Sequence, residues 1–181
     1  MVRLTPQRVA TYLPGRKIGV EGKTILAVSN GYFHTCAIAS DNQAYCWGYN
    51  SDGQLGGGTT FASSIGPHVV AVDTSGVLSG KTILSISASY YHTCAIASDN
   101  QAYCWGSGGG GKLGNNSTAD SSVPVAVDTS GVLSGKTILS ISAAPDHTCV
   151  IASDNQVYCW GTGANGQLGN NSTSQSLVPV A

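Results

Sequence analysis

Charged residues are scarce in this sequence of 181 residues. Lysine and arginine together number 8 and aspartate and glutamate 9, so 9% of the chain is charged and the formal net charge is −1. Binding to nucleic acid or to an anionic lipid surface depends on clustered lysine and arginine. The composition therefore predicts a protein that binds neither nucleic acid nor a membrane.

Long apolar runs are missing as well. No run approaches the roughly 20 residues that a membrane-spanning helix needs, and residues 1–15 lack the apolar core of a signal peptide. An exported form would carry its leader outside this sequence. Windows with helical periodicity are interrupted by glycine or proline, so we expect no substantial helix.

One segment of 15 residues occurs three times. It reads HTCAIASDNQAYCWG at residues 34–48 and 92–106, and HTCVIASDNQVYCWG at residues 147–161. Apolar and small residues flank an Asp-Asn pair, which tolerates the left-handed backbone of a tight turn. Each copy is therefore predicted to be a β-hairpin with one cysteine on either arm.

The two cysteines of each copy lie ten positions apart, almost symmetrically about the turn. Opposed residues of an antiparallel pair are close enough for a disulfide at non-hydrogen-bonded positions. We predict three bridges, and these favour an oxidising compartment. Reduced cysteines packed in the core are one alternative. A metal site is another, although His34 and one cysteine pair give three ligands where structural zinc takes four. The predicted bridges are Cys36–Cys46, Cys94–Cys104 and Cys149–Cys159.

The repeat period is 55 to 58 residues, which is typical of propellers and other repeat arrays. Four strand-like runs fall within each period, at residues 82–87, 92–98, 101–106 and 123–128 in the second copy. Four antiparallel strands make one propeller blade. The predicted fold class is all-β, with blades at residues 23–73, 74–128 and 129–181. Residues 1–22 are predicted to form an adapted N-terminal strand or cap.

The motifs resemble the regulator of chromosome condensation repeat. The resemblance rests on the Tyr-Cys-Trp-Gly runs at residues 45–48, 103–106 and 158–161, with Gly-Gln/Lys-Leu-Gly at residues 53–56, 111–114 and 166–169. It implies a β-propeller, usually of seven blades, that serves as a protein-binding platform. The cysteine pair resembles the bacterial, exported branch of the family, which implies a secreted or cell-surface protein.

Three blades are too few to close a ring. An open row of sheets leaves an unpaired edge and an apolar flank at each end, which favours association. We expect copies to join head to tail, two chains giving six blades, with residues 8–13 or 177–181 latching neighbouring chains. A fragment of a larger propeller is the alternative.

Differences between the copies are confined to certain loops. Residues 38–43 recur unchanged at 96–101 and 151–156, whereas the residues before each HTC motif and after each CWG motif vary. In a meander these variable loops emerge at one end of the strands, where binding residues usually lie. We predict a contact surface for a protein or glycan partner there, and neutral drift is the alternative. The predicted contact residues are Tyr32, Phe33, Tyr49, Tyr90, Tyr91, Pro145 and Asp146.

No constellation of residues predicts catalysis, a cofactor or a metal. His34, His92 and His147 recur in one setting, which favours a structural hydrogen bond, and the three tryptophans are expected in the core or between blades. Lys112 departs from the repeat and is expected at the solvated surface. Two further functions stay open. One is a structural or engineered self-assembling repeat, and the other is a hydrolase or lyase with its site in the central channel, although Asp52, Asp120 and Asp146 are scattered in sequence.

Overall fold

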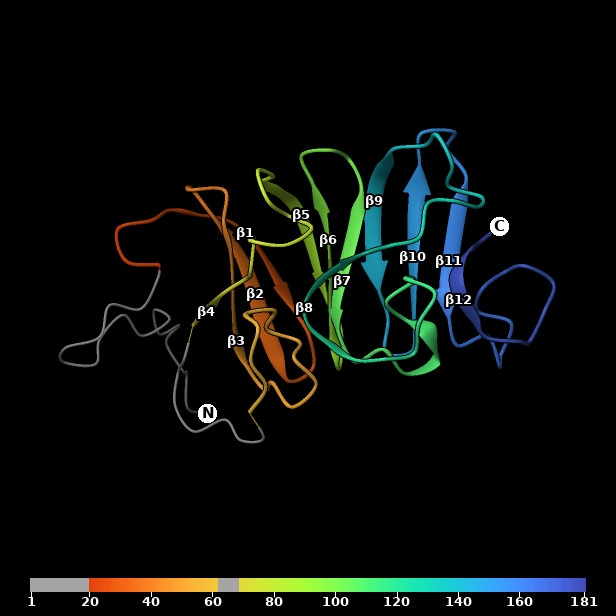
Figure 1. The fold of residues 1–181 in the computed structure, drawn as a ribbon, viewed down its shortest axis with the longest axis horizontal. Helices are drawn as coiled ribbons and strands as arrows, with labels where there is room; N and C mark the ends of the chain where they lie inside the picture. Colours follow the sequence, from red (N-terminus) through yellow and green to blue (C-terminus); the bar gives the residue numbers. More distant parts are fainter. Residues whose placement is uncertain (1–19, 62–68) are drawn as a thin grey trace, which may run out of the picture.

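The structure is a computed structural model, and it describes residues 20–61 and 69–181. Three four-stranded antiparallel sheets follow one another along the chain (Figure 1). The strands are β1 (Ile25–Asn30), β2 (His34–Ala39), β3 (Ala44–Gly48) and β4 (Val70–Ala71) in blade 1, β5 (Ile83–Ala88), β6 (His92–Ala97), β7 (Ala102–Gly106) and β8 (Ser121–Ala126) in blade 2, and β9 (Ile138–Ala143), β10 (His147–Ala152), β11 (Val157–Gly161) and β12 (Ser176–Val180) in blade 3.

The predicted all-β fold with four strands per repeat is confirmed. Each sheet is a meander in which sequential strands are neighbours. The segment at residues 177–181 supplies most of β12, the fourth strand of blade 3, whereas the predicted strand at residues 8–13 lies outside the described residues. The exact blade boundaries fall in the connections between sheets and stay a prediction.

Helical structure in the described ranges is limited to the 3₁₀ turn η1 (Gly109–Gly111). Within those ranges, no helix has the length and hydrophobicity required to cross a membrane.

The repeated hairpin forms for the reason that its turn residues suggest. Asn42 adopts φ 60°, and its amide donates to the Ala39 carbonyl at 2.8 Å. The Asp41 carboxylate accepts the amide of Gln43 at 3.2 Å. Asparagine and aspartate suit these positions because asparagine tolerates the left-handed region and aspartate caps its own turn. The same turn recurs at Asn100 and Asn155, with φ 58° and 61°.

All three predicted disulfides are present in the structure. The register of β2 and β3 sets Cys36 opposite Cys46, and the other two hairpins repeat this arrangement. Ala39 and Gln43, next to the turn, form a hydrogen-bonded pair. Hydrogen-bonded and non-hydrogen-bonded pairs alternate along an antiparallel ladder. Cys36 and Cys46 lie three positions farther from the turn and therefore form a non-hydrogen-bonded pair, in which opposed residues lie closest. The cysteines are therefore not available as the thiolate ligands of a metal.

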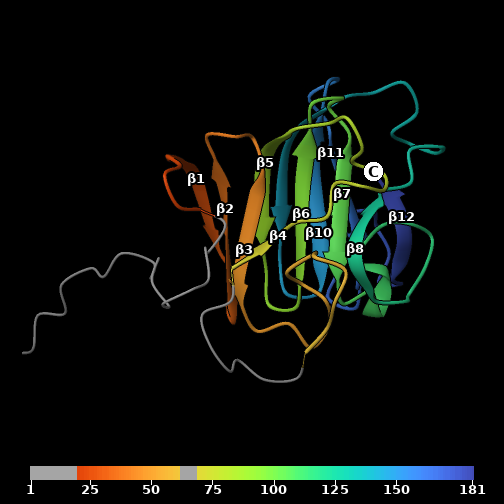
Figure 2. The ribbon, with the colours of Figure 1, turned by 60° about the vertical axis from the view of Figure 1, so that its left-hand side comes forward.

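Two apolar cores hold the blades together, one at each junction between neighbouring sheets. The first includes Leu55 and Leu78 with Trp105 of blade 2, and the second includes Leu113 and Leu133 with Trp160 of blade 3. Figure 2 shows the row of sheets turned so that blade 1 comes forward. The first strands of neighbouring blades contact each other, β1 with β5 and β5 with β9. Ser29 and Ser87 link them, because their hydroxyls accept the amides of Ala88 and Ala143 at 2.9 and 3.0 Å.

A polar relay crosses each junction inside the apolar core. The Thr93 hydroxyl donates to the Gln54 carbonyl at 2.9 Å, and the Trp105 indole donates to the same oxygen at 3.0 Å. Because the hydroxyl proton is used there, His34 Nε2, 2.7 Å from Thr93 Oγ1, must carry a proton and donate it. The second junction repeats the relay.

In the second relay, His92 Nε2 lies 3.0 Å from Thr148 Oγ1. The Lys112 carbonyl accepts from Thr148 at 3.1 Å and from Trp160 at 2.9 Å. The predicted structural hydrogen bond is therefore confirmed for His34 and His92, and the inter-blade position is confirmed for Trp105 and Trp160.

Candidate functional site

The variable loops gather at one end of the strands. In each meander, the first-to-second and third-to-fourth connections emerge at the end drawn lowest in Figure 1, and the Asp-Asn turns lie at the opposite end. We call these two ends of the molecule the loop face and the turn face. The loop face contains the predicted contact residues of all three blades.

Five of those residues form a continuous group, the aromatic cluster of Tyr32, Phe33, Tyr49, Tyr90 and Tyr91. The Tyr32 ring centroid lies 4.5 Å from that of Phe33 and 4.6 Å from that of Tyr90. Phe33 lies 5.7 Å from both Tyr49 and Tyr91. These separations fall within the range in which aromatic pairs attract each other. Loops of two different blades therefore build one aromatic surface.

The aromatic cluster is open to solvent. Tyr32 is 65% exposed and Phe33 44%, while Tyr90 and Tyr91 are 39% and 37% exposed. Large aromatic side chains that are both clustered and exposed are typical of interaction surfaces, because their burial by a partner is favourable.

Backbone hydrogen bonds fix the loops that present the aromatic rings. The Tyr32 amide donates to the Ser89 carbonyl at 3.1 Å, which joins the β1–β2 loop to the β5–β6 loop. Gly31 permits this approach, because a Cβ at that position would lie 2.1 Å from the same Ser89 oxygen. The Tyr49 amide donates to the Phe33 carbonyl at 2.9 Å. The rings are therefore held on a rigid frame.

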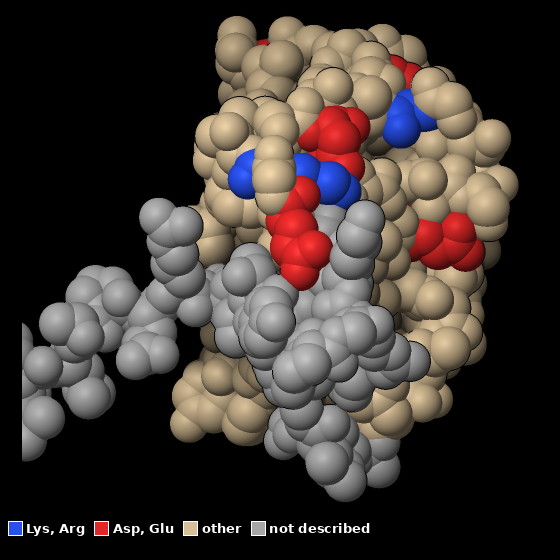
Figure 3. Space-filling view, turned by 90° about the vertical axis from the view of Figure 1, so that its left-hand side faces the viewer, with Lys and Arg blue, Asp and Glu red and all other residues tan. Residues whose placement is uncertain are grey.

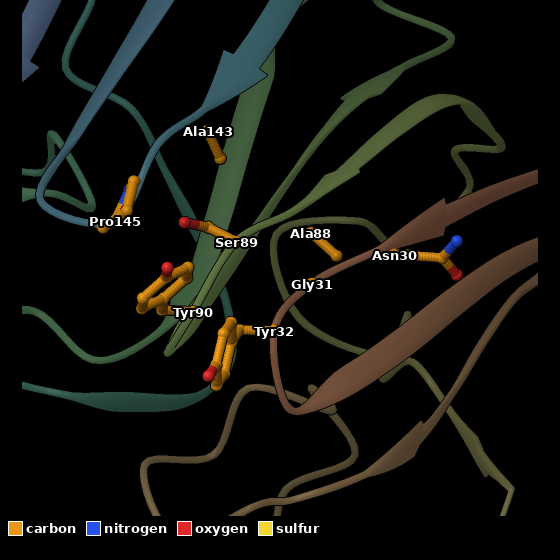
Figure 4. A pocket seen from close by; sticks show the side chains of 8 residues that line it. All are labelled: Asn30, Gly31, Tyr32, Ala88, Ser89, Tyr90, Ala143 and Pro145. Carbon is orange, nitrogen blue, oxygen red and sulfur yellow. The ribbon is translucent and has the colours of Figure 1, made fainter.

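A pocket of about 290 Å³ adjoins the aromatic cluster (Figure 4). All three blades contribute to it, because its lining comes from the ends of β1, β5 and β9 and from the loops that follow them. Tyr32 and Tyr90 lie together with Pro145 of blade 3 on one side of the view in Figure 4, and Asn30 lies on the other side. The lining residues are Asn30, Gly31, Tyr32, Ala88, Ser89, Tyr90, Ala143 and Pro145.

Ser89 supplies a polar group to this pocket. The residue is only 5% exposed, and its Oγ has no hydrogen-bond partner among the described residues. A buried hydroxyl without a partner costs free energy that a ligand group can recover. Ser89 was not among the contact residues predicted from the sequence. The signal that could have identified it is that the equivalent loop positions of the other two repeats hold the apolar residues Gly31 and Ala144.

Asp146 has a different role from the aromatic residues. Its carboxylate lies 3.7 Å from Lys112 Nζ, and the same ammonium donates to the Pro145 carbonyl at 3.4 Å. Lys112 is only 7% exposed, so the expectation that it is a solvated surface residue is wrong. The β7–β8 connection of blade 2 is in this way attached to the Pro145 loop of blade 3.

In the described part of the chain, the histidines and carboxylates do not converge on a common point. Burial lowers the pKa of His34 to about 4 and that of His92 to about 3. Both are thus neutral donors inside the junctions at neutral pH. Asp120 accepts the Gly108 amide at 2.8 Å, and Asp52 accepts the Ser51 hydroxyl at 2.7 Å. These carboxylates order separate loops, so no observation favours the central-channel hydrolase or lyase.

The sheets and their loop face define a segment of a β-propeller. The chain matches the regulator of chromosome condensation (RCC1) repeat family over residues 41–96, 99–151 and 154–181. A second description of the same repeat matches residues 25–54, 83–111 and 138–167. The chain belongs to this family, as the repeated motifs suggested.

Relatives in two groups of proteins support the assignment. The chain is 33% identical over 157 residues to the human probable E3 ubiquitin-protein ligase HERC3 and 31% identical over 172 residues to human HERC6. These matches cover 87% and 93% of the chain but only 14% and 16% of the two ligases. Yeast RCC1 (Prp20), solved with Kap60 bound, shares the fold with a TM-score of 0.71 at 20% identity, over 92% of this chain and 37% of the other.

Proposed function

We propose that the chain is a non-enzymatic binding module that holds a protein partner on its loop face. The observation that carries the proposal is the aromatic cluster beside a pocket whose buried Ser89 hydroxyl has no hydrogen-bond partner among the described residues. Tyrosine is a common interaction hot spot, and phenylalanine is enriched in interfaces. A protein segment that places an apolar side chain among the rings and a backbone group at Ser89 fits this chemistry.

Related structures support a protein as the partner. Yeast RCC1 was solved with Kap60 bound, and the Saccharomyces cerevisiae protein Prp20p, with a TM-score of 0.70 at 19% identity, is described together with its binding to Gsp1p and histones. Those partners belong to those proteins. A glycan partner, the other possibility raised by the sequence, stays a prediction.

An exported location is part of the proposal. Three disulfides support it, because such bonds persist in oxidising compartments and are rare in the cytosol. The partner is therefore expected among extracellular or cell-surface proteins.

The proposal also includes association between copies of the chain. The support for it is that the outer sheets of the row carry apolar residues at the surface, with Val28 61% and Val157 56% exposed. Exposed apolar surface of this kind favours association.

A displayed peptide library provides the test of partner binding. The folded, oxidised chain is used to select binders, and the affinity of each selected peptide is measured for the chain and for its Tyr32→Ala and Tyr90→Ala variants. We expect each substitution to weaken binding at least about tenfold, because an aromatic hot spot contributes 2 kcal/mol or more. Val132→Ala on the turn face is the control, since Val132 is as exposed as Tyr91, at 37%. Selected peptides that bind both tyrosine variants unchanged would contradict the proposal.

A further inference from the structure

The same residues that form the two internal junctions recur on the outer faces of the row. Ile83 and Ile138 pack into the junctions and are each 2% exposed, whereas Ile25, at the equivalent register position of blade 1, is 47% exposed. Ile38 and Ile96 are each 4% exposed, but Ile151 of blade 3 is 41% exposed. Each outer face therefore carries one half of a junction.

The outer face of blade 3, here called the tail face, comprises His147, Ile151, Val157 and the loop at Gln167 and Gly169. At the internal junctions, a Cβ on Gly56 or Gly114 would lie 2.6 Å from the Nε1 of Trp105 or Trp160. A Cβ on Gly169 would meet no atom within 4 Å. The tail face thus has, in Gly169, the glycine against which a tryptophan packs at the internal junctions. It also has Gln167, whose carbonyl corresponds to the carbonyls of Gln54 and Lys112.

The outer face of blade 1, here called the head face, comprises Ile25, Val28, Thr35 and Trp47. Thr35 and Trp47 are partly exposed, whereas Thr93, Thr148, Trp105 and Trp160 at the same repeat positions are 0% exposed. Figure 3 looks onto this end of the molecule, and much of its described surface is uncharged. Its Lys23 and Asp41 pair with each other at 2.7 Å. The head face thus offers the threonine and tryptophan that the tail face lacks.

We propose that the head face of one copy of the chain seats on the tail face of another and rebuilds the internal junction between them. Trp47 of the second copy packs on Gly169 and donates to the Gln167 carbonyl. The Thr35 hydroxyl donates to the same carbonyl and accepts the Nε2 proton of His147, as Thr93 does with Gln54 and His34. The relay on blade 3 is incomplete without these two residues.

A second copy is the occupant because both halves of the contact are present on one chain. The internal junctions show twice that these residue types fit each other in a single geometry. The two faces differ from each other, so the contact is heterologous and can repeat from copy to copy or close into a ring. The inference rests on the association proposed above and specifies the residues that make it.

Charge substitutions test the contact without disturbing the fold. Val28→Asp alters the head face and Val157→Asp the tail face, at residues that are 61% and 56% exposed. The mass of each protein is measured by light scattering over a wide range of concentrations. We expect the parent chain to rise from 18.4 kDa toward a mass of two chains. Each variant should associate at least about a hundredfold more weakly, because an unpaired charge is costly to bury. Val132→Asp on the turn face is the control.

A mixture of the two variants separates a head-to-tail contact from any other. The Val28→Asp variant has an unaltered tail face, and the Val157→Asp variant has an unaltered head face. When the two are combined, these two faces can form one intact contact. We expect two-chain particles in the mixture at concentrations where each variant alone is monomeric. A mixture that stays monomeric, a parent chain that is monomeric at every concentration, or variants that associate like the parent would overturn the inference.

The result is independent of the partner-binding test. Neither charge substitution touches the loop face, so selected peptides should bind the monomeric variants as they bind the parent chain. Association that survives both substitutions would show that copies meet elsewhere, which leaves the proposed association intact and removes only this contact.

Discussion

The internal junctions and the outer faces use the same residues in different surroundings. Trp105 and Trp160 are fully buried, whereas Trp47 is partly exposed, and the histidines and threonines of the relay differ in the same way. Because the chain repeats its motif, each internal residue has a matched partner on an outer face. Comparing the two positions separates the contribution of a residue type to the free energy of unfolding from the contribution of its burial.

The difference shows that the hairpin does not depend on the junction. All three copies have the same register between their second and third strands and the same turn, including the two whose sheets have an outer face. The hairpin is therefore fixed by local residues, and the junction adds stability on top of it. Three substitution experiments sharpen this distinction.

The largest expected effect comes from the tryptophans. Trp105→Ala removes a fully buried ring and its hydrogen bond to Gln54, so the free energy of unfolding should fall by about 3–5 kcal/mol. Trp47→Ala should cost less than this, because a partly exposed ring loses fewer contacts than a fully buried one. Urea unfolding of oxidised protein, at concentrations where it is monomeric, measures both. Equal losses would mean that burial at the junction does not set the contribution of the ring.

Acid should destabilise the internal junctions. Burial lowers the pKa of His34 from 6.5 to about 4, and His92 shifts in the same direction. A histidine with a lowered folded pKa contributes its full stability above the unfolded pKa of 6.5 and loses it as the pH falls toward 4. The loss from His34 is on the order of 3 kcal/mol. Unfolding midpoints measured between pH 7 and pH 4, a range set by these pKa values, should therefore fall.

Glutamine variants identify the groups responsible for this loss. His34→Gln keeps an amide donor for Thr93 but cannot take up a proton, so the fall in midpoint between pH 6.5 and 4 should become shallower. Val132→Ala on the turn face is the control, and its profile should follow that of the parent because Val132 has no ionisable group and lies outside the junctions. An unchanged slope in His34→Gln would assign the acid sensitivity to other groups.

The local elements were predictable from sequence, since their signals lie within a few residues. Strand alternation and the Asp-Asn turn set the hairpins, and the even placement of the cysteines about that turn set the disulfides. Clustering of the aromatic residues also followed from the meander, which sends variable loops to one end.

Contacts between blades were not predictable in the same way. The pairing of Asp146 with Lys112 and the pocket position of Ser89 depend on how neighbouring sheets are rotated against each other. The relay from histidine to threonine joins residues 56 to 59 positions apart. Repetition of the histidine showed that its copies share one structural setting. It did not identify the atom with which the side chain forms a hydrogen bond.

The smallest expected effect concerns the relay hydroxyl. Thr93→Val keeps the shape of the side chain but leaves the His34 Nε2 proton without an acceptor in the core, so unfolding free energy should fall by about 1–3 kcal/mol. Thr35→Val should change the stability of the monomer by less than about 0.5 kcal/mol, because Thr35 is partly solvated. Chemical unfolding measures both differences. If Thr35→Val nevertheless weakens association between copies, its hydroxyl acts in the contact between chains and not in the fold of one.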